Sequence, residues 1–130
     1  MPRVSLAFFF VGACCGLTGM IWGAYMGTHE DFTMAHAHAH LNLLGWVTLS
    51  LMGGFYALAG AARPKILSWV NFALSAAGVV VFIPGLIKAL SSQPGADAFL
   101  TPGGLMIMLG MATFIASIVT VFFKRAAAPA

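Results

Sequence analysis

The chain has 130 residues, of which 61% are hydrophobic and only 7% are charged, and its mean hydropathy is +0.97. A soluble globule has about a quarter of its residues charged and a disordered chain is poor in apolar residues, so both classes are excluded. The net charge of +3 comes from six scattered Lys and Arg residues, so nucleic acid is not an expected partner. The length suits a single domain, residues 1–130, in a lipid bilayer.

Four apolar stretches are each long enough to cross a hydrocarbon layer of about 30 Å, which takes roughly 20 helical residues. In chain order they cover about residues 4–26, 35–62, 66–90 and 101–123. Pro84 predicts a kink late in the third stretch, and Thr101 predicts a cap with Pro102 in the first turn of the fourth. Short connections favour antiparallel neighbours. The expected fold class is therefore all-α, an integral membrane four-helix bundle.

The charged residues predict how the spans are oriented. Five of the six basic residues fall on one side of the four predicted spans: Arg3, Arg63, Lys65, Lys124 and Arg125. The other side receives all three acidic residues, with Lys88 close to that edge: Glu30, Asp31 and Asp97. Because basic residues are retained on the cytoplasmic side, both termini are expected in the cytoplasm of a multi-pass protein of the bacterial inner membrane.

All four histidines of the chain lie together, before and at the start of the second apolar stretch: His29, His36, His38 and His40. Ionisable residues at the mouth of a membrane-spanning helix are costly and mark functional sites. Imidazole commonly binds haem iron, copper and zinc. The cluster therefore predicts a metal or haem site on the outer side of the membrane.

The backbone conformation of this segment decides which kind of site it can form. In a helix, residues two apart lie about 200° apart around the axis, while residues four apart share a face. His36 and His40 would then face one way and His38 nearly the opposite way, so that His38 and His40 serve different sites. In an extended segment all three would line one face and form a compact copper or zinc site, with His29 as a further ligand.

The segment His38-Ala-His40-Leu-Asn-Leu-Leu-Gly45 resembles the His-x-His segment of the catalytic subunit of haem–copper oxidases and nitric oxide reductases. In that family the first histidine is the proximal ligand of the high-spin haem, and the second ligates the low-spin haem from the opposite helix face. The subunit has twelve helices in three arcs of four, with metal ligands mainly on the second helix of each arc. Here too the histidines open the second of four helices, so the chain resembles one arc standing alone.

The resemblance implies haem b ligated by His38 and His40, with Asn42 near enough to hydrogen-bond a ligand imidazole or a propionate. In a ring of identical chains, His38 of one protomer would face His40 of its neighbour, and three protomers would supply twelve helices. The expected assembly is a homotrimer with haem between protomers. The family's copper site includes a vicinal His-His pair, which this sequence lacks, and Tyr56 lies too far beyond His40 to match. A complete binuclear oxidase or reductase site is therefore not expected.

Three interpretations stay open at this point. The preferred one is a b-type haem-binding membrane protein that transfers electrons or handles haem. The second is a copper- or zinc-binding membrane protein that uses His36, His38 and His40. The third is a structural or accessory subunit whose histidines sense pH or cap a helix. For Asn42, a hydrogen bond across helices is an equal alternative to a role at the haem.

Overall fold

The computed structural model describes residues 1–126, and nearly all of them are helical. The elements are α1 (Arg3–His29), α2 (Ala35–His40), the π-helix η1 (Leu41–Thr48), α3 (Leu49–Ala59), the 3₁₀ turn η2 (Gly60–Ala62), α4 (Lys65–Leu90) and α5 (Asp97–Ala126). α2, η1, α3 and η2 follow one another without a break, and together they form one rod, residues 35–62, called here the second span.

Within residues 1–126, four helical segments are long and apolar enough to cross a membrane: Arg3–His29, Ala35–Ala62, Lys65–Leu90 and Asp97–Ala126. The predicted all-helical fold, with four helices long and apolar enough to cross a membrane, is thus confirmed for the described residues, and the chain has the helical character of a membrane protein. The start of the fourth span was predicted wrongly. It begins at Asp97 and not at Thr101, because the amides of Phe99 and Leu100 already donate to the Ala96 carbonyl. Pro102 therefore lies inside α5 and not in its first turn.

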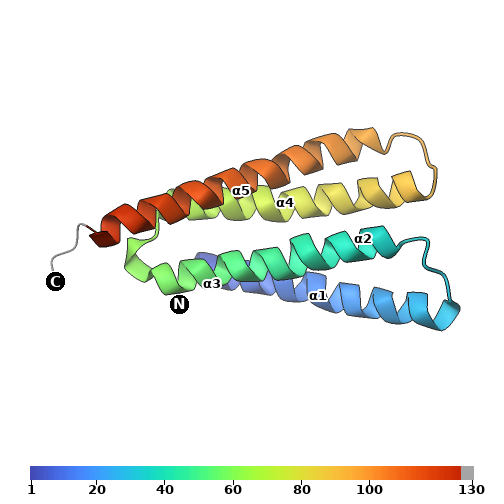
Figure 1. Cartoon of the computed structure of the whole chain (residues 1–130), viewed down its shortest axis with the longest axis horizontal. Coiled ribbons are helices and arrows are strands. Elements are labelled where there is room, and N and C mark those ends of the chain that lie inside the picture. Colours follow the sequence, from blue (N-terminus) through green and yellow to red (C-terminus); the bar gives the residue numbers. More distant parts are fainter. Residues whose placement is uncertain (127–130) are drawn as a thin grey trace.

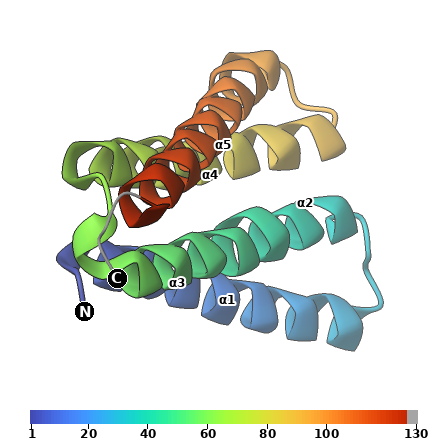
Figure 2. The ribbon, with the colours of Figure 1, turned by 60° about the vertical axis from the view of Figure 1, so that its left-hand side comes forward.

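The four spans are arranged as two antiparallel hairpins lying side by side (Figure 1). The N-terminus and the turn after the second span lie at one end, called here the basic end because Arg3, Arg63, Lys65, Lys124 and Arg125 belong to it. The connections 30–34 and 91–96 lie at the opposite end, called here the histidine end. Towards the histidine end α4 lies between α5 and α2 (Figures 1 and 2).

Aromatic side chains form the core near the basic end. Tyr56 is fully buried, and its ring stacks on Phe8 with 5.7 Å between ring centroids. Phe72 of α4 meets the Phe8 ring edge-on at 5.1 Å. The Tyr56 hydroxyl donates to Ser117 Oγ of α5 at 2.9 Å. Tyr56 of the second span therefore contacts both α1 and α5 at this end of the molecule.

Small residues let α4 and α5 approach closely. A Cβ placed on Gly103 would lie 2.8 Å from the Phe82 Cα, and one on Gly78 would lie 3.0 Å from the Ile107 amide nitrogen. Nearer the basic end the Asn71 amide donates to the Gly110 carbonyl at 2.7 Å. Helices in lipid associate through such close packing and through interhelical hydrogen bonds, because lipid supplies no hydrophobic drive for pairing.

Candidate functional site

The second span packs against a row of four glycines on α1. The row is Gly12, Gly16, Gly19 and Gly23, and the side chains opposite them, in the same order, are Ser50, Trp46, Asn42 and His38. A Cβ on any of these four glycines would come within 3.0 Å of the side chain opposite. The α1 glycines thus make room for the polar and aromatic face that carries His38.

The π-helix keeps that face in contact with α1. In an α-helix, four residues advance about 400°, so positions 38, 42, 46 and 50 would drift by about 40° at each step. The wider i→i+5 turn of η1 rotates each residue by a smaller angle and offsets this drift. Thr48 Oγ1 follows the same wider turn and donates to the Leu43 carbonyl five residues back, at 2.7 Å. Short π segments are frequent at functional sites, and this one begins directly after His40.

His38 is half-buried between the second span and α1. A Cβ on Gly23 would lie 3.0 Å from His38 Cε1, and the Trp22 ring meets the imidazole edge-on with 6.3 Å between centroids. The Asn42 amide donates to the His38 carbonyl at 2.9 Å and lies 3.3 Å from His38 Nε2. Asn42 and His38 are thus in contact, and Asn42 also packs against α1. The hydrogen-bond partners of the Asn42 amide therefore belong to His38 of its own span, and Asn42 meets α1 by packing against Gly19 and not through a hydrogen bond across helices.

His40 points away from α1 and is exposed. Its ring lies 5.8 Å from the Phe82 ring of α4, and its Nδ1 lies 2.8 Å from the His36 carbonyl oxygen. A carbonyl can only accept, so Nδ1 carries the proton and donates it. In the neutral ring Nε2 then keeps its lone pair free for a metal ion. Metal-binding histidines characteristically use their second nitrogen in this way.

His36 and His29 are both exposed, and they occupy different elements. His36 lies one turn before His40 on α2, on the same side of the helix. His29 is the last residue of α1, where its ring stacks on Tyr25 with 4.1 Å between centroids. Its Nδ1 donates to the Tyr25 carbonyl at 2.9 Å. His29 thus makes the same bond to its own helix as His40 does, and what separates it from the other three histidines is its place at the end of α1.

The segment that carries the histidines is helical, from Ala35 to His40. The helical alternative is thus the one that occurs: His38 faces α1 and His40 faces α4, and the extended backbone required for a compact site of three histidines is absent. Within residues 1–126, no three His, Cys, Asp or Glu side chains lie close enough together to hold a metal ion.

Two acidic residues follow His29 in the connection between α1 and α2. Glu30 closes α1 in a left-handed conformation with φ 52°, and Asp31 follows it. The Asp31 carboxylate accepts from the hydroxyl and from the amide of Thr33, at 2.6 and 3.0 Å. These two hydrogen bonds hold the pKa of Asp31 below its usual range. The connection between α1 and α2 is therefore anionic at neutral pH.

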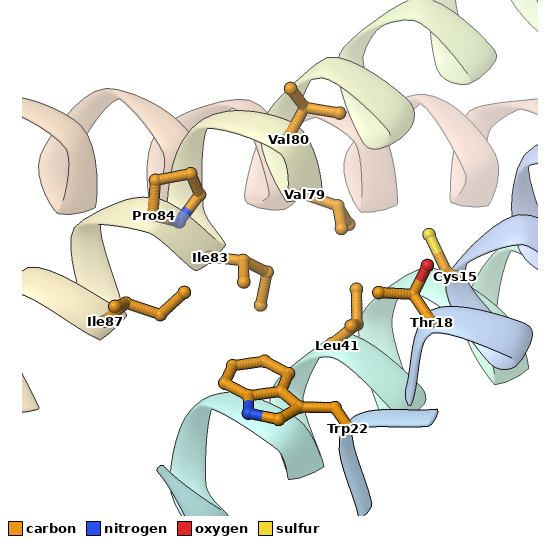
Figure 3. A pocket seen from close by; sticks show the side chains of 9 residues that line it. All are labelled: Cys15, Thr18, Trp22, Leu41, Val79, Val80, Ile83, Pro84 and Ile87. Carbon is orange, nitrogen blue, oxygen red and sulfur yellow. The ribbon is translucent and has the colours of Figure 1, made fainter. Parts of the chain in front are cut away.

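An apolar pocket of about 400 Å³ lies beside the site (Figure 3). It is bounded by α1, the second span and α4, and none of the four histidines lines it. Its lining residues are Cys15, Thr18, Trp22, Leu41, Val79, Val80, Ile83, Pro84 and Ile87. Trp22 connects the pocket to the site, because it also contacts the His38 ring.

Two features of the site were missed by sequence reasoning. The glycine row of α1 has four-three-four spacing, which is visible in the sequence and indicates a close helix contact. Its partners could not be named without knowing which face of the second span meets α1. The π-helix has no comparable sequence signal.

Comparison of the chain with protein-family models, with curated proteins and with solved structures finds no match.

Proposed function

We propose that the protein binds haem b in the membrane through the His-x-His segment and serves in electron transfer or haem handling. The observation that carries this proposal is the state of His40. Its ring is exposed at the mouth of a spanning helix, and its Nδ1 is bonded to the His36 carbonyl, so Nε2 is the nitrogen available to iron. Haem, when bound, would supply one-electron redox chemistry.

The placement of His38 favours a site shared between chains. His38 and His40 lie on opposite sides of α2, against α1 and α4 respectively, so one chain does not bring both to a single iron. In a closed ring, His40 of one protomer can meet His38 of its neighbour. The number three follows from the resemblance to a subunit built of three four-helix arcs. We therefore propose a homotrimer with about one haem per chain.

For such a shared site, the haem iron bound by His40 of one protomer must come within reach of the His38 ring of its neighbour. Its ring is half-buried, with Gly23 and Asn42 along one edge. In this proposal the amide of Asn42 would orient the imidazole or hydrogen-bond a propionate.

The proposal also includes the orientation of the protein in the membrane. Both termini and the basic end would lie in the cytoplasm of a bacterium, and the histidine end would lie outside.

A copper or zinc site is the second candidate, supported by one observation. His36 and His40 are both exposed and lie one turn apart on the same side of α2. Residues at this spacing commonly supply two ligands to one ion. Further ligands would have to come from another chain, because the described residues of one chain gather no third His, Cys, Asp or Glu.

An optical spectrum of the purified protein, combined with metal analysis, tests the proposal. Bis-histidine haem b gives a Soret band and, after reduction, sharp α and β bands. Protein that contains copper or zinc but shows no haem bands would support the second candidate instead. Protein that stays colourless after growth with excess haem precursor and carries no metal would overturn both, and would leave a structural role for the histidines.

A further inference from the structure

The apolar pocket between the hairpins has a charged group near one end. The pocket is lined on α4 by two rows of residues spaced four apart, 79–83–87 and 80–84. Lys88 continues the second row one turn beyond Pro84, towards the histidine end. Its ammonium lies 5.8 Å from the centre of the Phe99 ring of α5. Among residues 1–126, Lys88 is the only Lys or Arg at that end.

The apolar pocket and the basic side chain beyond it match the two parts of an amphiphile, an acyl chain followed by a charged headgroup. The pocket walls are apolar apart from Thr18, whose hydroxyl is already bonded to the Cys14 carbonyl at 2.8 Å. The walls belong to helices that are long and apolar enough to span a membrane, so in a bilayer the pocket would open towards lipid. Ile87 and Lys88 lie in the last turn of α4, which ends at Leu90, where a spanning helix reaches the headgroup layer.

We propose that this pocket binds one acyl chain of an anionic phospholipid, whose headgroup phosphate is held by the Lys88 ammonium. The chain would lie along Ile83, Pro84 and Ile87, with the Trp22 ring as the opposite wall (Figure 3). The charge of Lys88 selects the lipid class, because among the described residues it is the only Lys or Arg at this end, and Glu30, Asp31 and Asp97 would repel an anionic headgroup elsewhere on it. The bound lipid would fill the gap between the hairpins. The proposal does not depend on haem, since no histidine lines the pocket.

Fluorescence quenching by brominated lipids tests the proposal, because Trp22 forms part of the pocket wall. The full chain is reconstituted in phosphatidylcholine vesicles that contain a small fraction of brominated phosphatidylglycerol or, separately, of brominated phosphatidylcholine. One lysine near the surface is expected to give about a fivefold preference for the anionic lipid. The additional quenching by the anionic lipid should disappear in Trp22→Phe, since Trp46 and Trp69 lie outside the pocket.

Two variants and a matched control sharpen the result. Lys88→Gln should abolish the preference, whereas Lys65→Gln, which removes an exposed lysine at the basic end, should retain it. Val80→Phe places a larger side chain at the pocket wall from a position that is 68% exposed, so it should fold and still lose the preference. Equal quenching of the unmodified protein by the two brominated lipids would overturn the proposal. An unchanged preference in Lys88→Gln would overturn it as well.

Discussion

The two central histidines of the site differ in what surrounds them. His40 is exposed, and its Nδ1 donates to a carbonyl of its own helix, so the lone pair of Nε2 is free in the neutral ring. His38 is half-buried against the α1 glycine row and contacts Trp22 and Asn42. The sequence predicted that they would face opposite ways if helical. It could not predict their unequal burial, since that depends on which face of the second span meets α1.

We expect His40→Gly to remove haem while leaving the helices intact, because the side chain is exposed and contributes little packing. Free imidazole added to this variant should restore haem binding by occupying the space of the missing ligand. The measurement is haem per protein from the optical spectrum, with and without imidazole. His29→Gly is the control, because His29 is the last residue of α1 and lies outside the His-x-His segment, and it should retain haem. Full haem content in His40→Gly without imidazole would remove His40 from the ligand set.

At the basic end, Tyr56→Phe tests a buried hydrogen bond between the hairpins. The change removes the bond to Ser117 and keeps the aromatic packing with Phe8, so we expect about 1 kcal/mol less unfolding free energy. Tyr25→Phe is the matched control, because Tyr25 is 58% exposed, and its effect should stay below about 0.5 kcal/mol. Denaturation in mixed detergent micelles measures both. Equal stability of the two variants would show that the Tyr56 hydroxyl contributes nothing.

At the scale of the helices, sequence patterns predicted the spans well and their ends less well. Apolar length located all four spans, because crossing a bilayer imposes that length directly. The start of α5 was missed, since Thr101-Pro102 has the pattern of a helix start while the connection 91–96 already leads into a helix at Asp97. The π-helix was also missed. It accompanies the contact of Asn42 and Trp46 with the α1 glycines, a tertiary interaction that a local sequence pattern does not reveal.

Two adjacent glycines of α5 test how closely the hairpin is packed. A Cβ at Gly103 would meet the backbone of Phe82, which cannot move aside locally, whereas a Cβ at Gly104 would be 3.7 Å from its nearest neighbour. We expect Gly103→Ala to lower the unfolding free energy by about 1–3 kcal/mol. Gly104→Ala should be neutral or stabilising by up to about 1 kcal/mol, because alanine favours a helix over glycine. The same denaturation assay compares them, and an equal loss in both variants would contradict the packing described.

For the whole molecule, the grouping of charges follows from the fold while the direction of insertion is a prediction. The hairpin arrangement brings five basic residues to one end and the histidines to the other. We expect reporter enzymes fused in the connections 30–34 and 91–96 to be active outside the membrane. A reporter fused in the turn near Arg63 should be active in the cytoplasm. The reverse pattern at all three positions would invert the topology and place the histidines inside.

The claim that haem is shared between protomers is tested most directly by native mass spectrometry of the haem-loaded protein in a mild detergent. Because His38 and His40 lie on opposite sides of one helix, haem should appear only in oligomers, and it should hold them together. The predicted species is a trimer with about one haem per chain, and removal of haem should increase the monomer. A monomer that retains its haem would contradict the account.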